Sequence, residues 1–249
     1  MSTSELSITK RRLLGGIAIA AVGFALTACS DAEDKAASAE AKPAVSNETT
    51  ASTTPAVEIP TADRDVDMEA ALKPGPLKEM ALGDPNAPVK VIEYMSMTCP
   101  HCAHFHENTF EAIKTKYVDT GKVYFVLREF PFPQDTASLA AFMLARCTTE
   151  DKYFPFVSMF LKQQRTWAAP ADGDVRGAML QLSKLGGFTQ ETFDACLTNA
   201  QLAGDVSAVR DRGAQEFGVQ STPTFLINGK AYSGDMSVDS MSALIDSLL

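Results

Sequence analysis

The sequence has little of what a metal centre or a haem attachment site requires. It contains three histidines and five cysteines among 249 residues, and its single C-x-x-C pair is Cys99 and Cys102. A closed zinc site needs four ligands, but there is no second C-x-x-C pair and no H-x-x-x-H motif. Attachment of c-type haem requires a histidine directly after the second cysteine, where this sequence has Ala103. We therefore expect no metal, although a site that adds His104 or His106 to the two cysteines stays open as an alternative.

The sequence also lacks an excess of basic residues. Its 22 lysines and arginines are outnumbered by 31 aspartates and glutamates, which gives a net charge of −9. Proteins that bind nucleic acids contact phosphates through lysine and arginine, so this balance argues against a nucleic-acid partner. No internal repeat is visible. A composition of 45% hydrophobic and 21% charged residues is typical of a globular protein with one sizeable core.

The first 28 residues are predicted to be a signal peptide. Three basic residues precede a small-residue apolar run over 13–26, which is too short to span a membrane comfortably. The run ends in Leu-Thr-Ala-Cys, which resembles a bacterial lipobox and predicts that Cys29 carries lipid. An ordinary signal peptide, with Cys29 incidental, is the alternative. The paired arginines at 11 and 12 resemble an incomplete twin-arginine signal, and either export route leads to a compartment where disulfides persist.

Residues 29–62 are predicted to form a disordered tether in front of a folded domain over 63–249. The segment is rich in Ala, Ser, Thr, Glu and Pro and shows no apolar periodicity. Such a segment cannot bury enough apolar surface to offset the entropy lost on ordering. Its expected role is to hold the domain away from a membrane.

The most informative stretch covers residues 89–110. An apolar run over 89–95, rich in β-branched and aromatic residues, predicts a buried strand. After a turn, Cys99-Pro100-His101-Cys102 begins a predicted helix, because proline fits the first helical turn. The free N–H groups and the positive end of the dipole at a helix N-terminus favour a thiolate over a thiol. This position predicts thiol–disulfide exchange, with Cys99 as the nucleophile and Cys102 as the resolving cysteine.

This stretch resembles the active site of the thioredoxin superfamily, and its Pro-His dipeptide is that of the DsbA branch of periplasmic dithiol oxidases. The sequences Gly-Asp-Pro-x-Ala-Pro at 83–88 and Arg-x-Phe-Pro at 128–131 also resemble the family. Thr222-Pro223 matches the family's cis-proline position, which implies that the backbone of Thr222 binds an extended client segment. An ordinary trans turn is the alternative.

The predicted fold class is α/β, a thioredoxin fold with an inserted α-helical subdomain over about 135–205. We expect a short helix over 64–73, strands over 77–82 and 122–127, and helices of the insert that end near 186–187 and begin after Thr189. Asn228-Gly229 predicts a hairpin turn, and Ser237 is expected to cap the last helix.

Three further side chains have predicted roles near the cysteines. His101 is expected to stabilise the Cys99 thiolate by a hydrogen bond or by charge, which would make the disulfide a stronger oxidant. Glu93 matches a family position where a carboxylate beneath the active site relays protons, and a solvent-facing strand residue is the alternative. His104 and His106 are expected at the helix surface, although the family more often has an acid at position 106.

Cys147 and Cys196 are predicted to form a structural disulfide, because both would lie in the helical insert in an oxidising compartment. Two buried free thiols are the alternative.

The resemblance implies a protein that needs no cofactor beyond its redox-active disulfide and oxidises unfolded or reduced exported proteins. It further implies a quinone-linked reoxidant in the membrane, and we expect a periplasmic monomer that is lipid-anchored to a bacterial membrane. A disulfide isomerase or reductase and a tethered metal-binding protein are the competing hypotheses. Isomerases of this superfamily usually carry an N-terminal dimerisation domain, where this sequence has the tether.

Overall fold

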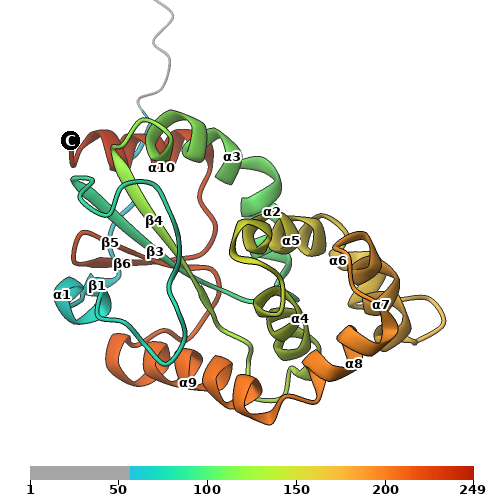
Figure 1. The fold of residues 1–249 in the computed structure, drawn as a ribbon. Helices are drawn as coiled ribbons and strands as arrows, with labels where there is room; N and C mark the ends of the chain where they lie inside the picture. The colour runs from blue at the N-terminus through green and yellow to red at the C-terminus, as the bar shows by residue number, and fades with distance from the viewer. Residues whose placement is uncertain (1–56) are drawn as a thin grey trace, which may run out of the picture. The chain divides into compact units, whose positions relative to one another are not determined.

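The computed structural model describes residues 57–249 (Figure 1). The predicted signal peptide over 1–28, the predicted lipidation site Cys29 and most of the predicted tether lie outside the described residues. Within residues 57–249, no helix combines the length and the apolar character that crossing a membrane requires.

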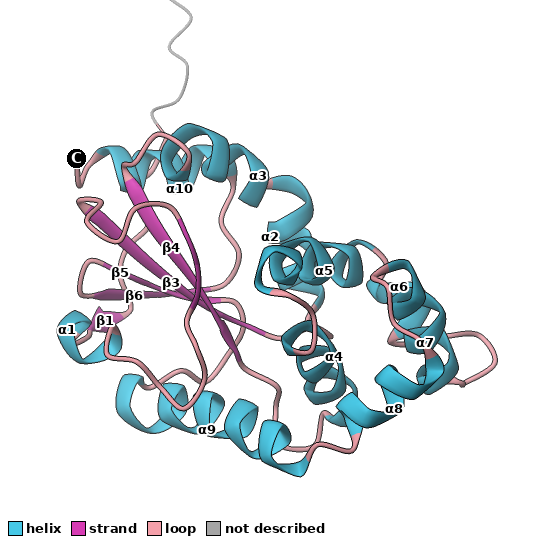
Figure 2. Ribbon diagram, viewed as in Figure 1, coloured by secondary structure: helices cyan, strands magenta, loops and turns pink. Residues whose placement is uncertain are grey.

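A six-stranded sheet forms the centre of the described domain (Figure 2). In spatial order, its strands are β1 (Arg64–Asp65), β6 (Lys230–Ser233), β5 (Thr224–Ile227), β3 (Val89–Met95), β4 (Val123–Glu129) and β2 (Met80–Leu82). β3 and β4 are parallel, whereas every other neighbouring pair is antiparallel. The two parallel strands are almost wholly buried, and strands buried on both faces have continuous apolar sequences.

Helices cover both faces of this sheet (Figure 1). One face carries α2 (Pro100–Asn108), α3 (Phe110–Ile113), a π-helical turn η1 (Lys114–Val118) and α10 (Val238–Asp246), and the other carries α1 (Met68–Ala71) and α9 (Ala200–Phe217). Along β3, Val91 belongs to the hydrophobic cluster on the α2 face of the sheet, whereas Ile92 and Tyr94 belong to a second cluster on the α9 face. A Cβ atom at Gly213 of α9 would lie 2.6 Å from the Tyr94 ring, so glycine permits the close approach of α9.

The remaining helices cluster beside the sheet, at the right of Figure 1. They are α4 (Thr136–Arg146), α5 (Glu150–Lys162), α6 (Gln164–Trp167), α7 (Val175–Leu185) and α8 (Gln190–Leu197). Side-chain caps fix where these helices begin: Asp135 accepts from the Ser138 N–H, and Thr189 and Thr192 form a capping box. α9 runs through the predicted end of the insert near 205 and contacts both α4 and β4.

Several local predictions have definite outcomes. The Asn228-Gly229 hairpin is confirmed, because both residues have positive φ angles, 42° and 88°, between β5 and β6. The predicted helix over 64–73 is partly wrong: the segment starts as strand β1, paired with β6, and its Arg64 side chain hydrogen bonds to the Phe217 carbonyl. These tertiary contacts override the local helical pattern. The short helix α6 was not expected.

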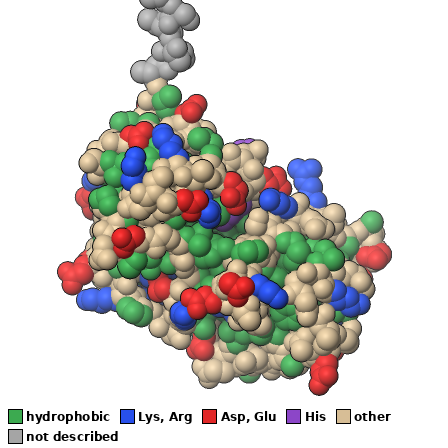
Figure 3. Space-filling view, turned by 45° about the horizontal axis from the view of Figure 1, so that its top comes forward, with side chains coloured by type: hydrophobic (Ala, Val, Ile, Leu, Met, Phe, Trp, Pro, Cys, Tyr) green, Lys and Arg blue, Asp and Glu red, His purple; other side chains and the backbone are tan. Residues whose placement is uncertain are grey.

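A pocket of about 440 Å³, lined by both apolar and charged side chains, lies between β2, α3 and α5. Figure 3 shows apolar side chains gathered in the middle of one face of the domain. Met80, Leu82, Phe110 and Phe154 supply much of its wall. The pocket has none of the predicted site residues in its lining.

Candidate active site

Cys99 lies where strand β3 passes into helix α2. The residue is the N-cap of α2, with an extended backbone at φ −76° and ψ 120°, and Pro100 follows in the first turn. The Cys99 N–H donates to the Ser96 carbonyl at 3.2 Å, which closes the turn after the strand. Cys99 therefore lies at the N-terminus of α2, where the backbone N–H groups of His101 and Cys102 lower the pKa of its thiol.

The Cys99 thiol is strongly acidic. Its pKa is lowered to about 5, first by a hydrogen bond from the Cys102 thiol and then by Thr222 and the backbone N–H groups of Cys102 and His101, while partial burial opposes the change. When protonated, Cys99 Sγ donates to the Thr222 carbonyl oxygen at 3.2 Å. Cys99 is half-buried, so an acidic sulfur is within reach of other molecules.

Cys102 has the opposite character. It is fully buried, and burial raises its pKa well above the usual value, with further contributions from Cys99 and from the charge of Glu93. Both cysteines are free thiols in this structure. The site therefore combines one reactive thiolate with one protonated thiol.

The loop opposite Cys99 contains Thr222 and Pro223, joined by a cis peptide bond. The Thr222 hydroxyl is buried and has no hydrogen-bond partner among residues 57–249. That hydroxyl is free to donate to a thiolate on Cys99, which agrees with its effect on the Cys99 pKa. Gly234 supports the loop by donating its N–H to the Pro223 carbonyl at 2.9 Å.

Glu93 and His106 form a buried pair. His106 Nε2 lies 2.9 Å from Glu93 Oε2 and 3.2 Å from Oε1, and the two residues are 4% and 0% exposed. The prediction that His106 lies at the helix surface is wrong, and the solvent-facing alternative for Glu93 does not hold. A signal was present in the sequence, because His106 is four residues from buried Cys102 and shares its helix face.

The two other histidines of α2 face a carboxylate that the sequence analysis missed. His104 Nδ1 lies 2.7 Å from Asp235 Oδ2, and His101 Nδ1 lies 3.8 Å from Asp235 Oδ1. Among the hydrogen bonds of residues 57–249, none joins the His101 imidazole to Cys99. His101 acts on the Cys99 pKa through its backbone N–H instead.

The helical cluster formed by α4 to α8 is hydrogen bonded to the turn that precedes Cys99. Gln164 of α6 is 8% exposed, and its amide nitrogen donates to the carbonyls of Met97 at 2.9 Å and of Cys99 at 3.0 Å. Ser138 of α4 accepts from the Met97 N–H at 3.0 Å. These residues, too, were missed, because only the folded chain brings them to the turn.

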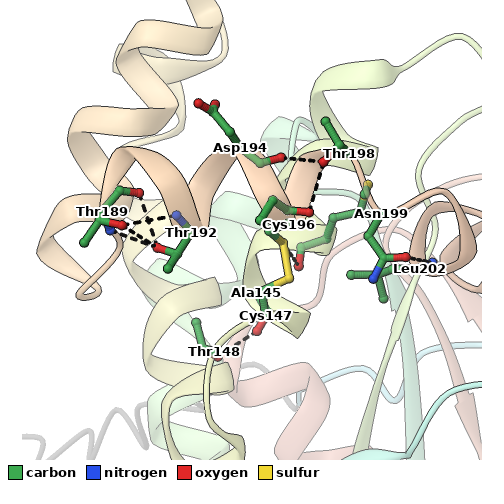
Figure 4. The surroundings of a disulfide bond; sticks show 12 residues. Ala145, Cys147, Thr148, Thr189, Thr192, Asp194, Cys196, Thr198, Asn199 and Leu202 are labelled. Atoms are coloured by element: carbon green, nitrogen blue, oxygen red, sulfur yellow. Dashed lines mark hydrogen bonds between the residues drawn. A yellow bond between two sulfur atoms is a disulfide. The ribbon is translucent and has the colours of Figure 1, made fainter.

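Cys147 and Cys196 form a disulfide between the end of α4 and helix α8 (Figure 4). Their Cα atoms are 6.2 Å apart and 49 positions separate them in the chain, so the alternative of two free thiols does not hold. As Figure 4 shows, the helix that carries Cys196 begins at the Thr189–Thr192 capping box.

The metal-binding hypothesis does not fit the geometry of the described chain. Residues 57–249 contain no group of three or more His, Cys, Asp or Glu side chains that could hold a metal ion. His104 and His106 each contact a carboxylate, Asp235 and Glu93 respectively, rather than the two cysteines.

The sheet, the helix-capping cysteine pair and the facing proline loop together define a thioredoxin-like dithiol protein, and comparisons with known proteins agree. A family model described as thioredoxin matches residues 77–247, more than half of the chain. The chain belongs to this thioredoxin family, as a DsbA-like member.

Individual relatives bear related names. A Rickettsia felis protein named "Putative protein-disulfide oxidoreductase" is 34% identical over 172 residues, 69% of this chain and 60% of that protein. The crystal structure of alpha-DsbA1 from Wolbachia pipientis matches with 29% identity and a TM-score of 0.66, over 73% of this chain and 96% of that one. A protein-disulfide isomerase from Novosphingobium aromaticivorans matches with 25% identity and a TM-score of 0.61, over 68% and 96%. The chain spans about three fifths of the length of the Rickettsia relatives that it matches.

Proposed function

We propose that this protein is a thiol:disulfide oxidoreductase that donates a Cys99–Cys102 disulfide to reduced exported proteins. The observation that carries the proposal is the contrast between the two thiols: the pKa of Cys99 is lowered to about 5, and that of Cys102 is raised. A stabilised Cys99 thiolate stabilises the dithiol form, so the disulfide is readily given up and acts as an oxidant.

The reaction has two exchange steps. A client thiolate attacks Cys99 Sγ, the bond to Cys102 breaks, and Cys102 leaves as a thiolate that takes up a proton. A second client thiolate then attacks the client sulfur of the mixed disulfide, and Cys99 leaves as its stabilised thiolate. Two electrons pass from the client to the cysteine pair. A separate oxidant must then remove them, and a quinone-linked membrane partner is the class that the family resemblance suggests.

Glu93 and His106 supply the proton that Cys102 takes up. The pair is buried, and His106 lies one helical turn beyond Cys102 on the same face of α2. The charge of Glu93 acts on Cys102, which supports their proximity. Bulk water has little access to the fully buried Cys102. The Cys102 thiolate therefore needs a proton donor inside the protein.

The Thr222-Pro223 loop binds the client. The Thr222 carbonyl lies 3.2 Å from Cys99 Sγ, so a segment that pairs with this backbone would bring its cysteine to the nucleophile. The proposed setting is the periplasm, with a monomeric domain held to the membrane through lipid on Cys29. Support for that anchor comes from the lipobox-like sequence at 26–29.

Disulfide isomerisation is the second candidate, supported by the similarity to the Novosphingobium isomerase. The deciding experiment measures the reduction potential of the Cys99–Cys102 pair against glutathione, together with oxidation of a reduced two-cysteine peptide. An oxidase should have a potential near about −120 mV and should oxidise the peptide stoichiometrically. A potential near about −180 mV, with reshuffling of a scrambled protein, would favour the isomerase, and one near about −270 mV would favour a reductase.

A further inference from the structure

Asp235 places one carboxylate against two imidazoles of the active-site helix. It contacts His104 at 2.7 Å and His101 at 3.8 Å, through different carboxylate oxygens. The two histidines are three residues apart on α2 and therefore neighbours on one helix face. Their side chains are 66% and 73% exposed, whereas that of Asp235 is 28% exposed. The carboxylate is thus the more buried member of the group.

The backbone around Asp235 is anchored on both sides. Gly234, directly before it, donates its N–H to the Pro223 carbonyl at 2.9 Å. Met236, directly after it, accepts from the Thr109 hydroxyl at 2.8 Å, at the end of α2. The loop between β6 and α10 is therefore bonded both to the proline loop and to the active-site helix. These bonds hold the Asp235 carboxylate beside the cysteine motif.

This arrangement has a consequence for the charge near Cys99. An imidazole near a thiolate can stabilise it by a hydrogen bond or by positive charge. Here the imidazole of His101, the residue between the two cysteines, is directed to a carboxylate. That carboxylate balances any positive charge on the histidines and adds a negative one to the surroundings of the thiolate. Both effects oppose the thiolate.

We propose that Asp235 is a positioning residue that holds His101 and His104 away from Cys99 and so limits the oxidising power of the Cys99–Cys102 disulfide. The inference rests on the proposed thiol–disulfide exchange at this site. On this view the acidity of Cys99 comes from the helix N-terminus, Cys102 and Thr222. The imidazoles of His101 and His104 do not stabilise the thiolate as long as Asp235 holds them. The loop at 234–236, which carries no cysteine motif, then sets how strong an oxidant the protein is.

The test replaces Asp235 with asparagine in the full chain and measures the glutathione equilibrium and the thiolate absorbance of Cys99 against pH. In D235N the negative charge is lost and the imidazoles are released, so the Cys99 pKa should fall. The equilibrium with glutathione should shift about fivefold toward the dithiol form, which corresponds to about 20 mV for a two-electron couple. The shift should shrink at high salt, because exposed charges are screened.

Two comparisons separate positioning from a general charge effect. D239N makes the same charge change four residues away, at an exposed position in the first turn of α10, and should leave the equilibrium within twofold of the wild type. In an H101Q background, the shift caused by D235N should be clearly smaller, because the His101 imidazole that it would release is absent and only the loss of charge and the release of His104 remain. An equal shift in that background, or no shift in D235N, would overturn the proposal. The proposed function is judged on the wild-type potential alone, so the two can fail independently.

Discussion

Glu93 and His106 are hydrogen bonded in the interior of the domain, with His106 Nε2 2.9 Å from Glu93 Oε2. The pair joins β3 to α2, the two elements that meet at Cys99. Phe105 and Phe110 pack their rings against the imidazole. Removing one member of such a buried polar pair costs free energy of unfolding, because no water can replace the hydrogen bond that the remaining member loses.

Replacing His106 with phenylalanine should therefore destabilise the domain, although the ring packing is kept. The variant leaves Glu93 buried without its donor, for an expected loss of about 3 kcal/mol in the free energy of unfolding. Denaturant unfolding of the reduced protein measures it. His104→Phe is the matched control, since that side chain is 66% exposed, and it should change stability by less than about 0.5 kcal/mol. Equal effects of the two variants would contradict the importance of the buried pair.

His106 illustrates which features of this protein could be predicted from its sequence and which could not. Local signals were sufficient for the buried strand β3, for the proline-initiated helix α2 and for the Asn228-Gly229 turn, because each depends on neighbouring residues. The burial of His106 depends on a glutamate of another element, and a histidine alone does not reveal such a partner. Asp235 reaches the motif only through the folding of the loop between β6 and α10.

Thr222 offers a test of how the Cys99 thiolate is stabilised. Its buried hydroxyl has no partner among the described residues and lowers the Cys99 pKa. Thr222→Val keeps the shape and removes the donor, so the Cys99 pKa should rise by about one unit, equivalent to about 1.4 kcal/mol. The disulfide should become a weaker oxidant accordingly. Thiolate absorbance against pH measures the first effect and the glutathione equilibrium the second. An unchanged titration would mean that the hydroxyl does not reach the sulfur.

The acidity of Cys99 should also make the stability of the reduced protein depend on pH. Its pKa is about 5 in the folded state and about 8.5 in an unfolded chain. A group whose folded pKa is depressed stabilises the fold above its unfolded pKa, and this contribution disappears as the pH falls through the folded value. After allowance for solvent screening at this half-buried thiol, we expect a loss of roughly 2–3 kcal/mol between about pH 9 and pH 5.

The comparison with Cys99→Ser isolates this contribution, because serine does not ionise in that range. Denaturant unfolding of both proteins under reducing conditions should show a stability difference that narrows as the pH falls. A difference that is independent of pH would mean that Cys99 is not acidic in the folded protein, which would also remove the main support for the oxidase.

The link between the helical cluster and the cysteine pair can be tested at Gln164. Its amide group donates to the carbonyls of Met97 and Cys99, so Gln164→Met, which has a similar shape and no donor, leaves two carbonyls short of a partner. The expected cost is about 1–3 kcal/mol of unfolding free energy. Gln163→Met is a matched control, since Gln163 is the adjacent, exposed residue, and it should be nearly neutral.

A purely structural role for Gln164 would end at that loss of stability. If Gln164 also fixes the Cys99 backbone, the N–H groups at the start of α2 lose their alignment on the sulfur, and the Cys99 pKa should rise in Gln164→Met but not in Gln163→Met. Thiolate titration of the folded variants, at temperatures well below unfolding, measures this effect separately from stability. A destabilised variant with a wild-type Cys99 titration would show that the helical cluster supports the turn without adjusting its chemistry. A raised pKa would mean that the inserted helices help to determine how strongly the protein oxidises its clients.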